Sequence, residues 1–122
     1  MAFMFRGRSI DKVGVIGSGQ IGPDIALHFV KVLHPFGVQV IVVDVVDEAL
    51  EKGKAKLFKK VDKGGEKGVF KPAQVEGMKS HVTFTSDYGQ LKGANVVVEA
   101  ATEDLPLKRR IFKQVEELVD FL

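Results

Sequence analysis

Short apolar runs alternate with helical periodicities along this chain. Residues 13–16 and 38–43 are almost wholly apolar and rich in valine and isoleucine, which is typical of parallel strands buried on both faces. Residues 95–100 have a similar character, and residues 81–85 alternate between polar and apolar side chains as a shorter strand. The pattern therefore predicts four strands.

Helical stretches separate these strands. In the first stretch, the periodicity predicts a core face made of Ile25, Phe29 and either Val32 or Leu33. The opposite stripe of the same helix carries Asp24 and His28, which we expect to face solvent. This helix should therefore be amphipathic and lie against the sheet.

Further helices are expected downstream. The second should span about residues 48–62 and end at the glycine-rich residues 64–68, and the third should span residues 72–79. A last helix, with Asp104 as its N-cap, should follow the fourth strand. Each helix would then connect to, or follow, a strand of the sheet.

Strands that alternate with helices form α/β folds with a parallel sheet. With right-handed crossovers, the expected strand order is third, second, first and fourth. The predicted fold class is a Rossmann-type doubly wound, mainly parallel sheet, truncated after the fourth strand and its following helix. Residues 12–122 would form this incomplete domain, with its second half and a substrate domain absent, and residues 1–11 a flexible N-terminal extension.

A glycine turn joins the first strand to the first helix. The glycines at positions 17, 19 and 22 have the GxGxxG spacing of a dinucleotide-binding turn. Gly17 allows the tight turn, Gly19 lets backbone N–H groups approach a pyrophosphate, and Gly22 lets the helix pack close to the strand. The anion would then lie at the helix N-terminus, where unpaired N–H groups and the helix dipole favour it.

A carboxylate ends the second strand. Asp44 lies roughly twenty residues beyond the glycine turn, where an acid can accept hydrogen bonds from the ribose hydroxyls of an adenosine. It would repel a 2′-phosphate, and Val45 and Val46 offer no arginine to accommodate one, so NAD is expected to bind better than NADP. The alternative interpretation is that Asp44 is only the first residue of the next turn.

Composition argues against several classes of protein. The net charge of +2 with mixed signs gives no case for nucleic acid, and a chain without cysteine has neither disulfides nor thiolate metal sites. No apolar stretch approaches the roughly 20 residues that span a bilayer, and the N-terminal residues lack the apolar region of a signal peptide. We therefore expect a cytoplasmic protein without a metal site, a nucleic-acid partner or a membrane contact.

The span from Lys12 to Val119 resembles the N-terminal NAD-binding domain of the 3-hydroxyacyl-CoA dehydrogenases. Beyond the glycine turn, residues 96–108 (VVVEAATEDLPLK) are similar to that family's VVEA signature with its later acidic pair and lysine. The resemblance implies an NAD-dependent oxidoreductase, in its full length, that oxidises 3-hydroxyacyl-CoA to 3-ketoacyl-CoA in fatty-acid β-oxidation. It also implies an acyl-CoA substrate, and we expect a homo-oligomer.

Carried over residue by residue, the resemblance implies a cofactor site in two parts. The turn would hold the pyrophosphate and Asp44 the adenosine ribose, while Ala100 and Ala101 would line the nicotinamide half, which Glu103 and Lys108 would contact. The residues of the turn are Gly17, Ser18, Gly19, Gln20, Ile21 and Gly22. Taken alone, the glutamate could be a helix-entry carboxylate and the lysine a solvated side chain.

In the family, the helical tail after the second strand helps to bind CoA. Lysines on the polar face of the expected second helix are candidates here on charge alone, and a solvated face is the other interpretation. These candidates are Lys56, Lys59, Lys60 and Lys63.

No catalytic residue is expected in this chain. The resemblance implies that the catalytic histidine comes after the position matched by Leu122, and His28, His34 and His81 fit structural roles. Hydride transfer from an alcohol needs a base that takes the hydroxyl proton, so this chain alone is predicted to bind NAD without catalysis. Two alternatives stay open: a stand-alone NAD-sensing module, and a dehydrogenase of a small β-hydroxy acid.

Overall fold

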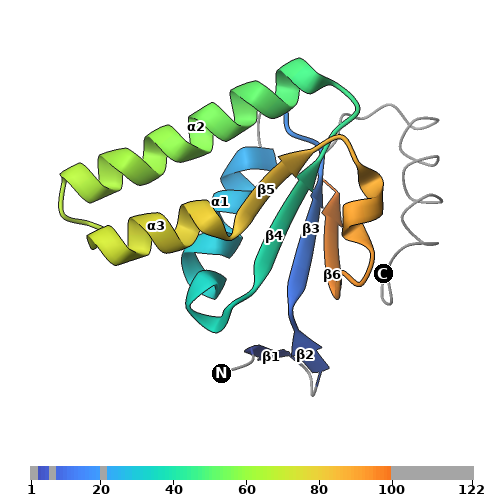
Figure 1. Cartoon of the computed structure of the whole chain (residues 1–122), viewed down its shortest axis with the longest axis horizontal. Helices are drawn as coiled ribbons and strands as arrows, with labels where there is room; N and C mark the ends of the chain where they lie inside the picture. The colour runs from blue at the N-terminus through green and yellow to red at the C-terminus, as the bar shows by residue number, and fades with distance from the viewer. Residues whose placement is uncertain (1–2, 6–7, 20–21, 100–122) are drawn as a thin grey trace.

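The computed structural model describes residues 3–5, 8–19 and 22–99. A four-stranded parallel sheet has the order β5–β4–β3–β6, as Figure 1 shows. Its strands are β3 (Lys12–Ile16), β4 (Gln39–Val43), β5 (Val82–Thr85) and β6 (Val96–Glu99). The strand order expected from right-handed crossovers is confirmed, and with it the Rossmann-type class.

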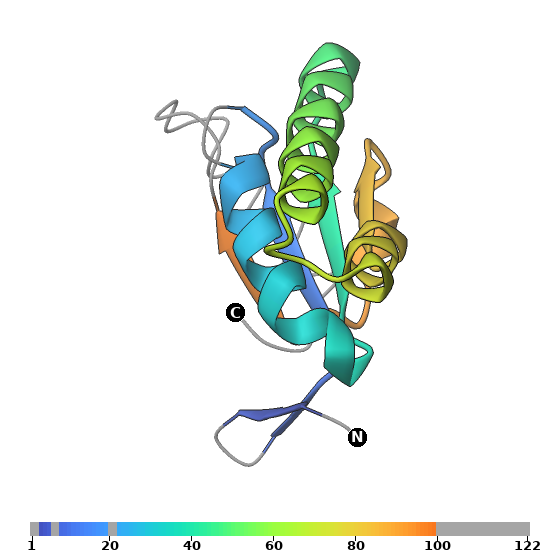
Figure 2. The ribbon, with the colours of Figure 1, turned by 90° about the vertical axis from the view of Figure 1, so that its left-hand side faces the viewer.

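Helices connect the strands on both faces of the sheet. Those described are α1 (Gly22–Leu33), η1 (His34–Phe36), α2 (Asp47–Glu66), α3 (Pro72–Ser80) and η2 (Tyr88–Leu91). Helices α1, α2 and α3 share one face and lie side by side in Figure 2, whereas η2 packs on the other face through Tyr88 and Leu91. The helix expected at residues 104–122 lies outside the described residues.

The main core lies between the sheet and the three α-helices. The valines at 40, 42 and 43 are fully buried, as expected for a strand covered on both faces. Leu57 and Val61 of α2 and Met78 of α3 meet this sheet face at 1% exposure or less. These buried side chains pack α2 against the sheet, so the helix is part of the core.

The buried face of α1 matches the predicted one in part. Ala26, Val30 and Leu33 are the buried apolar side chains, while Ile25 and Phe29 are half-buried and Val32 is 49% exposed. The buried stripe begins at Gly22 and Pro23, which are small enough to let the helix lie close to the sheet. Leu33 is therefore buried as predicted, Ile25 and Phe29 pack at the margin of the core, and Ala26 and Val30 form the centre of the contact face, where close packing favours smaller residues.

Helix α2 continues past the point where the sequence predicted its end. It runs through Gly64 and Gly65, and the chain turns only at Gly68, whose φ of 75° lies in the left-handed region. A Cβ at Gly64 would overlap the ring of Phe70, and one at Gly65 would lie 2.9 Å from Val75. These two glycines therefore let the chain fold back and pack on α2.

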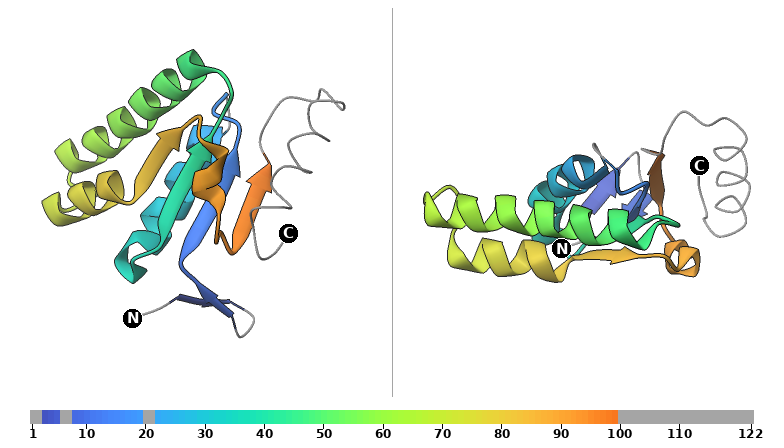
Figure 3. Two further views of the ribbon diagram at one scale, coloured as in Figure 1. Left: turned by 45° about the vertical axis from the view of Figure 1, so that its right-hand side comes forward. Right: turned by 90° about the horizontal axis from the view of Figure 1, so that it is seen from above.

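The first residues form a hairpin at the amino end of β3. Strands β1 (Phe3–Phe5) and β2 (Arg8–Ile10) pair antiparallel and project below the sheet in Figure 3. Ile10 is 5% exposed and packs with Val13, Leu33 and Val38. The expected extension therefore contains a core residue at the end of β2, while its flexibility stays a prediction.

No helix in the described ranges is long and apolar enough to cross a bilayer.

The packing of α2 predicts the effect of truncating its buried side chains. Leu57→Ala should lower the free energy of unfolding by about 2–5 kcal/mol, because it removes apolar contacts and leaves a cavity. Lys59→Ala, on the exposed side of the same helix, should change it by less than about 0.5 kcal/mol. Urea unfolding measures both values. Equal values for the two variants would show that α2 is not packed on the sheet.

Candidate cofactor site

The predicted turn and acid meet at the carboxyl edge of the sheet. Gly17 follows β3 with a φ of 105°, a conformation that favours glycine, and its N–H donates to the Val43 carbonyl at 2.7 Å. This bond closes the turn onto the end of β4. The residue that follows β4 is Asp44, so the fold brings these distant segments together, at the edge where open α/β sheets bind ligands.

The Asp44 carboxylate is held by two backbone donors. The Ser18 N–H donates to its Oδ2 at 2.8 Å, and the Val46 N–H donates to its Oδ1 at 2.9 Å. One oxygen is thereby tied to the glycine turn and the other to the loop that leads into α2. Asp44 is only partly buried, so ligand hydroxyls can still approach the remaining lone pairs.

Ser18 and Gly19 are neighbours in the turn with opposite environments. Ser18 is 2% exposed, and its hydroxyl donates to the Ala49 carbonyl in the first turn of α2 at 2.9 Å. Gly19 is exposed, and a Cβ placed on it would meet no atom within 4 Å. The open side of the turn is therefore at Gly19, and the Ser18 side chain faces the protein.

These features fit a dinucleotide. The turn offers open space beside Gly19 in which a pyrophosphate can approach the backbone, and α1 begins immediately after it with a buried Gly22. The carboxylate of Asp44 offers acceptors for ribose hydroxyls at the adjacent strand end. The backbone donors of the turn thus match a pyrophosphate, and the carboxylate acceptors match the ribose of the same adenosine diphosphate.

Six of the predicted cofactor residues lie outside the described residues. They are Gln20, Ile21, Ala100, Ala101, Glu103 and Lys108.

The candidate CoA-binding lysines divide into two pairs. Lys60 and Lys56 bind Asp24 of α1 at 2.6 and 3.3 Å, and the lysine bonded at 2.6 Å is the main reason why the pKa of Asp24 is lowered. Lys59 and Lys63 are exposed on α2. The first pair therefore joins α2 to α1, and the second pair has the solvated position that a polar face predicts.

Tyr88 of η2 also lies at this edge, and the sequence pattern did not identify it as a candidate. It is 7% exposed, and burial, followed by the charge of Asp44, raises the pKa of its phenol. Its ring packs with Ile16 and Val43 at the ends of β3 and β4. An isolated aromatic residue within a polar turn was the available signal, since such a ring usually packs into a core.

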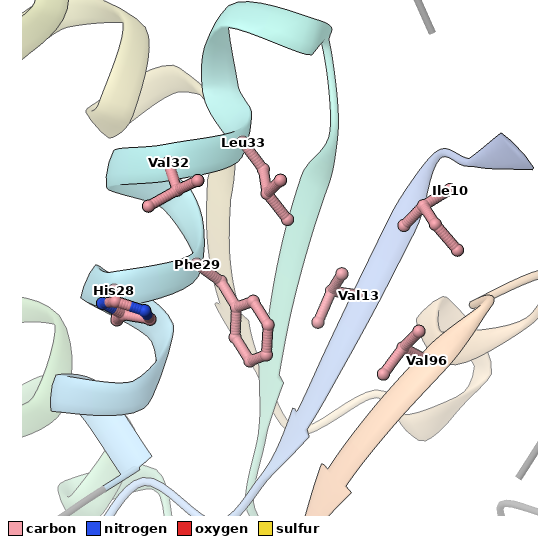
Figure 4. A pocket seen from close by; sticks show the side chains of 7 residues that line it. All are labelled: Ile10, Val13, His28, Phe29, Val32, Leu33 and Val96. Atoms are coloured by element: carbon pink, nitrogen blue, oxygen red, sulfur yellow. The ribbon is translucent and has the colours of Figure 1, made fainter. Parts of the chain in front are cut away.

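An apolar groove lies at the other end of the sheet, between α1 and the first residues of β3 and β6 (Figure 4). Its volume is about 280 Å³, and Phe29, Val32, Val13 and Val96 form most of its walls. His28 is the one side chain in its lining with hydrogen-bonding atoms. A pyrophosphate needs several donors, so this groove is not the cofactor site.

The other two histidines also lie away from the site. The His34 Nδ1 lies 2.8 Å from the Val30 carbonyl, and the His81 Nδ1 lies 2.7 Å from the Gly77 carbonyl, each at the end of a helix. His81 precedes β5, at the amino edge of the sheet. Among the described residues, no cluster of three metal-ligating side chains occurs.

The chain is similar to known 3-hydroxyacyl-CoA dehydrogenases. The family model described as "3-hydroxyacyl-CoA dehydrogenase, NAD binding domain" matches residues 12–121. A probable 3-hydroxybutyryl-CoA dehydrogenase from Deinococcus radiodurans is 36% identical over 108 residues, which cover 88% of this chain and 37% of that protein. A fatty acid oxidation complex subunit alpha from Shewanella halifaxensis is 34% identical over 110 residues, which cover 89% of this chain and 15% of that protein.

Solved structures agree with these relatives. An (S)-3-hydroxybutyryl-CoA dehydrogenase from Ralstonia eutropha superposes with a TM-score of 0.79 at 33% identity, covering 91% of this chain and 38% of that one. A 3-hydroxybutyryl-CoA dehydrogenase from Escherichia coli gives 0.80 at 29% identity, covering 90% and 22%. The chain therefore spans well under half the length of the proteins that it matches.

The position of Tyr88 predicts an unusual tyrosine titration. The chain has one tyrosine and no tryptophan, so absorbance near 295 nm reports this phenol alone. Its midpoint should lie above the ordinary pKa of 10.0, and Asp44→Asn should lower the midpoint partway, because burial remains when the charge is removed. The unfolded chain ionises at the lower pH, so the fold should also lose stability above about pH 10. A midpoint at or below 10.0 would contradict this assignment.

Proposed function

Since the chain belongs to the family of 3-hydroxyacyl-CoA dehydrogenase NAD-binding domains, we propose that its cofactor site is the turn after β3 together with Asp44. The observation that carries this proposal is the meeting of an open backbone at Gly19 with a carboxylate fixed at the neighbouring strand end. NAD is the cofactor of this family, and when bound it supplies the acceptor for a substrate hydride.

The residues of this chain would bind and orient the cofactor. Backbone N–H groups around Gly19 and the start of α1 would face the pyrophosphate, and Asp44 would accept hydrogen bonds from the adenosine ribose. The same carboxylate would exclude a 2′-phosphate, because two negative charges would lie within contact distance. Val45 and Val46, which are 63% and 51% exposed, add no cation that could offset this repulsion.

The nicotinamide half of the site rests on the family likeness. By that likeness, Ala100 and Ala101 would line it, and Glu103 and Lys108 would contact the cofactor there. In the sequence these residues follow β6, and β6 is the neighbour of β3, the strand that precedes the glycine turn.

The activity that we propose for the longer protein is oxidation of a 3-hydroxyacyl-CoA to the 3-ketoacyl-CoA, with NAD, in fatty-acid β-oxidation. It requires a base within hydrogen-bond reach of the substrate hydroxyl. His34 and His81 lie at helix ends away from Asp44, so neither supplies that base. We further propose that the exposed Lys59 and Lys63 face the phosphates of the acyl-CoA. We also propose that the longer protein is a homo-oligomer and that it is cytoplasmic.

Gly19 gives a sharp test of the cofactor site. Gly19→Val should abolish measurable NADH binding, because the new side chain would fill the space that the pyrophosphate needs, and it should leave the fold intact, because that space is empty of protein atoms. Calorimetry measures the affinity, and a thermal melt checks the fold. Glu51→Ala, an exposed substitution on α2, serves as the control and should bind normally. Unchanged affinity in the valine variant would show that the turn does not face the ligand.

The reaction is tested with two lengths of protein. The 122-residue chain is expected to bind NADH without turnover. A protein that joins it to the remaining part found in its relatives is expected to oxidise NADH with acetoacetyl-CoA. Turnover of acetoacetate in place of the thioester would favour a small β-hydroxy acid dehydrogenase, and NAD binding without turnover of either would favour a sensing module.

A further inference from the structure

Ser18 lies in the predicted phosphate-binding turn, yet both of its donors are used inside the protein. Its N–H donates to the Asp44 carboxylate at 2.8 Å, and its hydroxyl donates to the Ala49 carbonyl at 2.9 Å. With only 2% of its surface exposed, the side chain has no face left for a ligand. Ser18 therefore joins the end of β4 to the first turn of α2.

Helix α2 has a glycine, Gly53, at the position where it contacts Ser18. Gly53 lies one turn after Ala49, on the same side of the helix, and it is buried. A Cβ on Gly53 would overlap the Ser18 hydroxyl oxygen and would lie 2.9 Å from Cγ of Pro23 in α1. It would also lie 3.2 Å from the ring of Phe84 in β5. The glycine turn, α1 and β5 thus all approach α2 at Gly53, where the helix has no side chain.

We propose that Ser18 is a positioning residue and that Gly53 is its partner on α2: their contact fixes the cofactor turn and, through the Ser18 N–H, the carboxylate of Asp44. This deepens the proposed function, since it names what sets the choice between NAD and NADP at that site. Ser18 then acts without touching the cofactor, which differs from the role that the family likeness implied for it.

The proposal makes a specific link between α2 and cofactor choice. If the Ser18 side chain loses its place, its N–H moves away from Oδ2 of Asp44, and the carboxylate keeps only the bond from Val46. A carboxylate with one fixed oxygen can rotate away from a 2′-phosphate. Affinity for NADH should then fall more than affinity for NADPH, so their ratio should narrow.

The test compares four variants of the 122-residue chain. Ser18→Ala removes the hydroxyl, Gly53→Ala adds the obstructing Cβ, and the double variant combines them. Glu51→Ala, exposed on the same helix, is the control. Fluorescence titrations with NADH and with NADPH give both dissociation constants, and thermal melts report the fold.

Ser18→Ala should weaken NADH binding by up to about tenfold, because binding can spend at most about the free energy of one buried hydrogen bond on re-forming the site, and it should narrow the ratio of NADH affinity to NADPH affinity. Gly53→Ala should weaken NADH binding more than Ser18→Ala does, and it should narrow the ratio of NADH affinity to NADPH affinity further. In the double variant the combined loss should be smaller than the product of the two single losses, because the closest atom that the new Cβ meets, the Ser18 oxygen, is gone and only the longer contacts with Pro23 and Phe84 remain. Glu51→Ala should match the wild type in both affinities.

An unchanged affinity ratio in Ser18→Ala, or losses that multiply in the double variant, would overturn the proposal. A merely destabilising change would lower both affinities by the same factor and leave the ratio as it was. Amide hydrogen exchange without nucleotide separates this proposal from the proposed function. The amide of residue 18 should exchange faster in Ser18→Ala than in wild type, even if the chain were to bind no nucleotide, whereas the amide of residue 46 keeps its bond to Oδ1 of Asp44 and should exchange as before. Unchanged exchange at residue 18 would also overturn the proposal.

Discussion

The carboxylate of Asp44 connects the two loops on which the proposed site depends. Each loop leaves a parallel strand, and each has a backbone N–H that the sheet no longer satisfies. The carboxylate accepts both of these bonds, from Ser18 and from Val46. Because a charged acceptor forms stronger hydrogen bonds than a neutral one, one side chain holds the glycine turn in place beside the start of α2.

Small residues make this arrangement possible. Gly22 and Ala26 let α1 lie close to the sheet, and Gly53 lets α2 approach the turn. The ion pairs of Asp24 with Lys56 and Lys60 then join the two helices on their exposed sides. The exposed pairs add little stability by themselves, so it is the close packing that positions the site.

Much of the sheet, and the meeting of the residues in the proposed site, was predictable from the sequence. Apolar runs of the right length gave the strands, handedness gave their order, and the GxGxxG spacing with a later acid located Gly17, Gly19 and Asp44. The face of α1 was predicted only in part, because apolar residues at both 25 and 26 allow two neighbouring contact faces, and Ala26 and Val30 form the centre of the one that is buried. The end of α2 was misplaced because glycine lowers helix propensity, whereas here Phe70 and Val75 pack over Gly64 and Gly65.

By itself the sequence determined the fold class, the family likeness and the glycine turn that we propose as the cofactor site, because these follow from local patterns: strand length, glycine spacing and a signature of neighbouring residues. Only the tertiary structure decided what Ser18, Gly53 and Tyr88 do. Ser18 and Gly53 lie 35 positions apart and meet because α2 crosses over the turn. Such contacts depend on how helices and strands pack, and packing is a property of the folded chain that no local pattern contains.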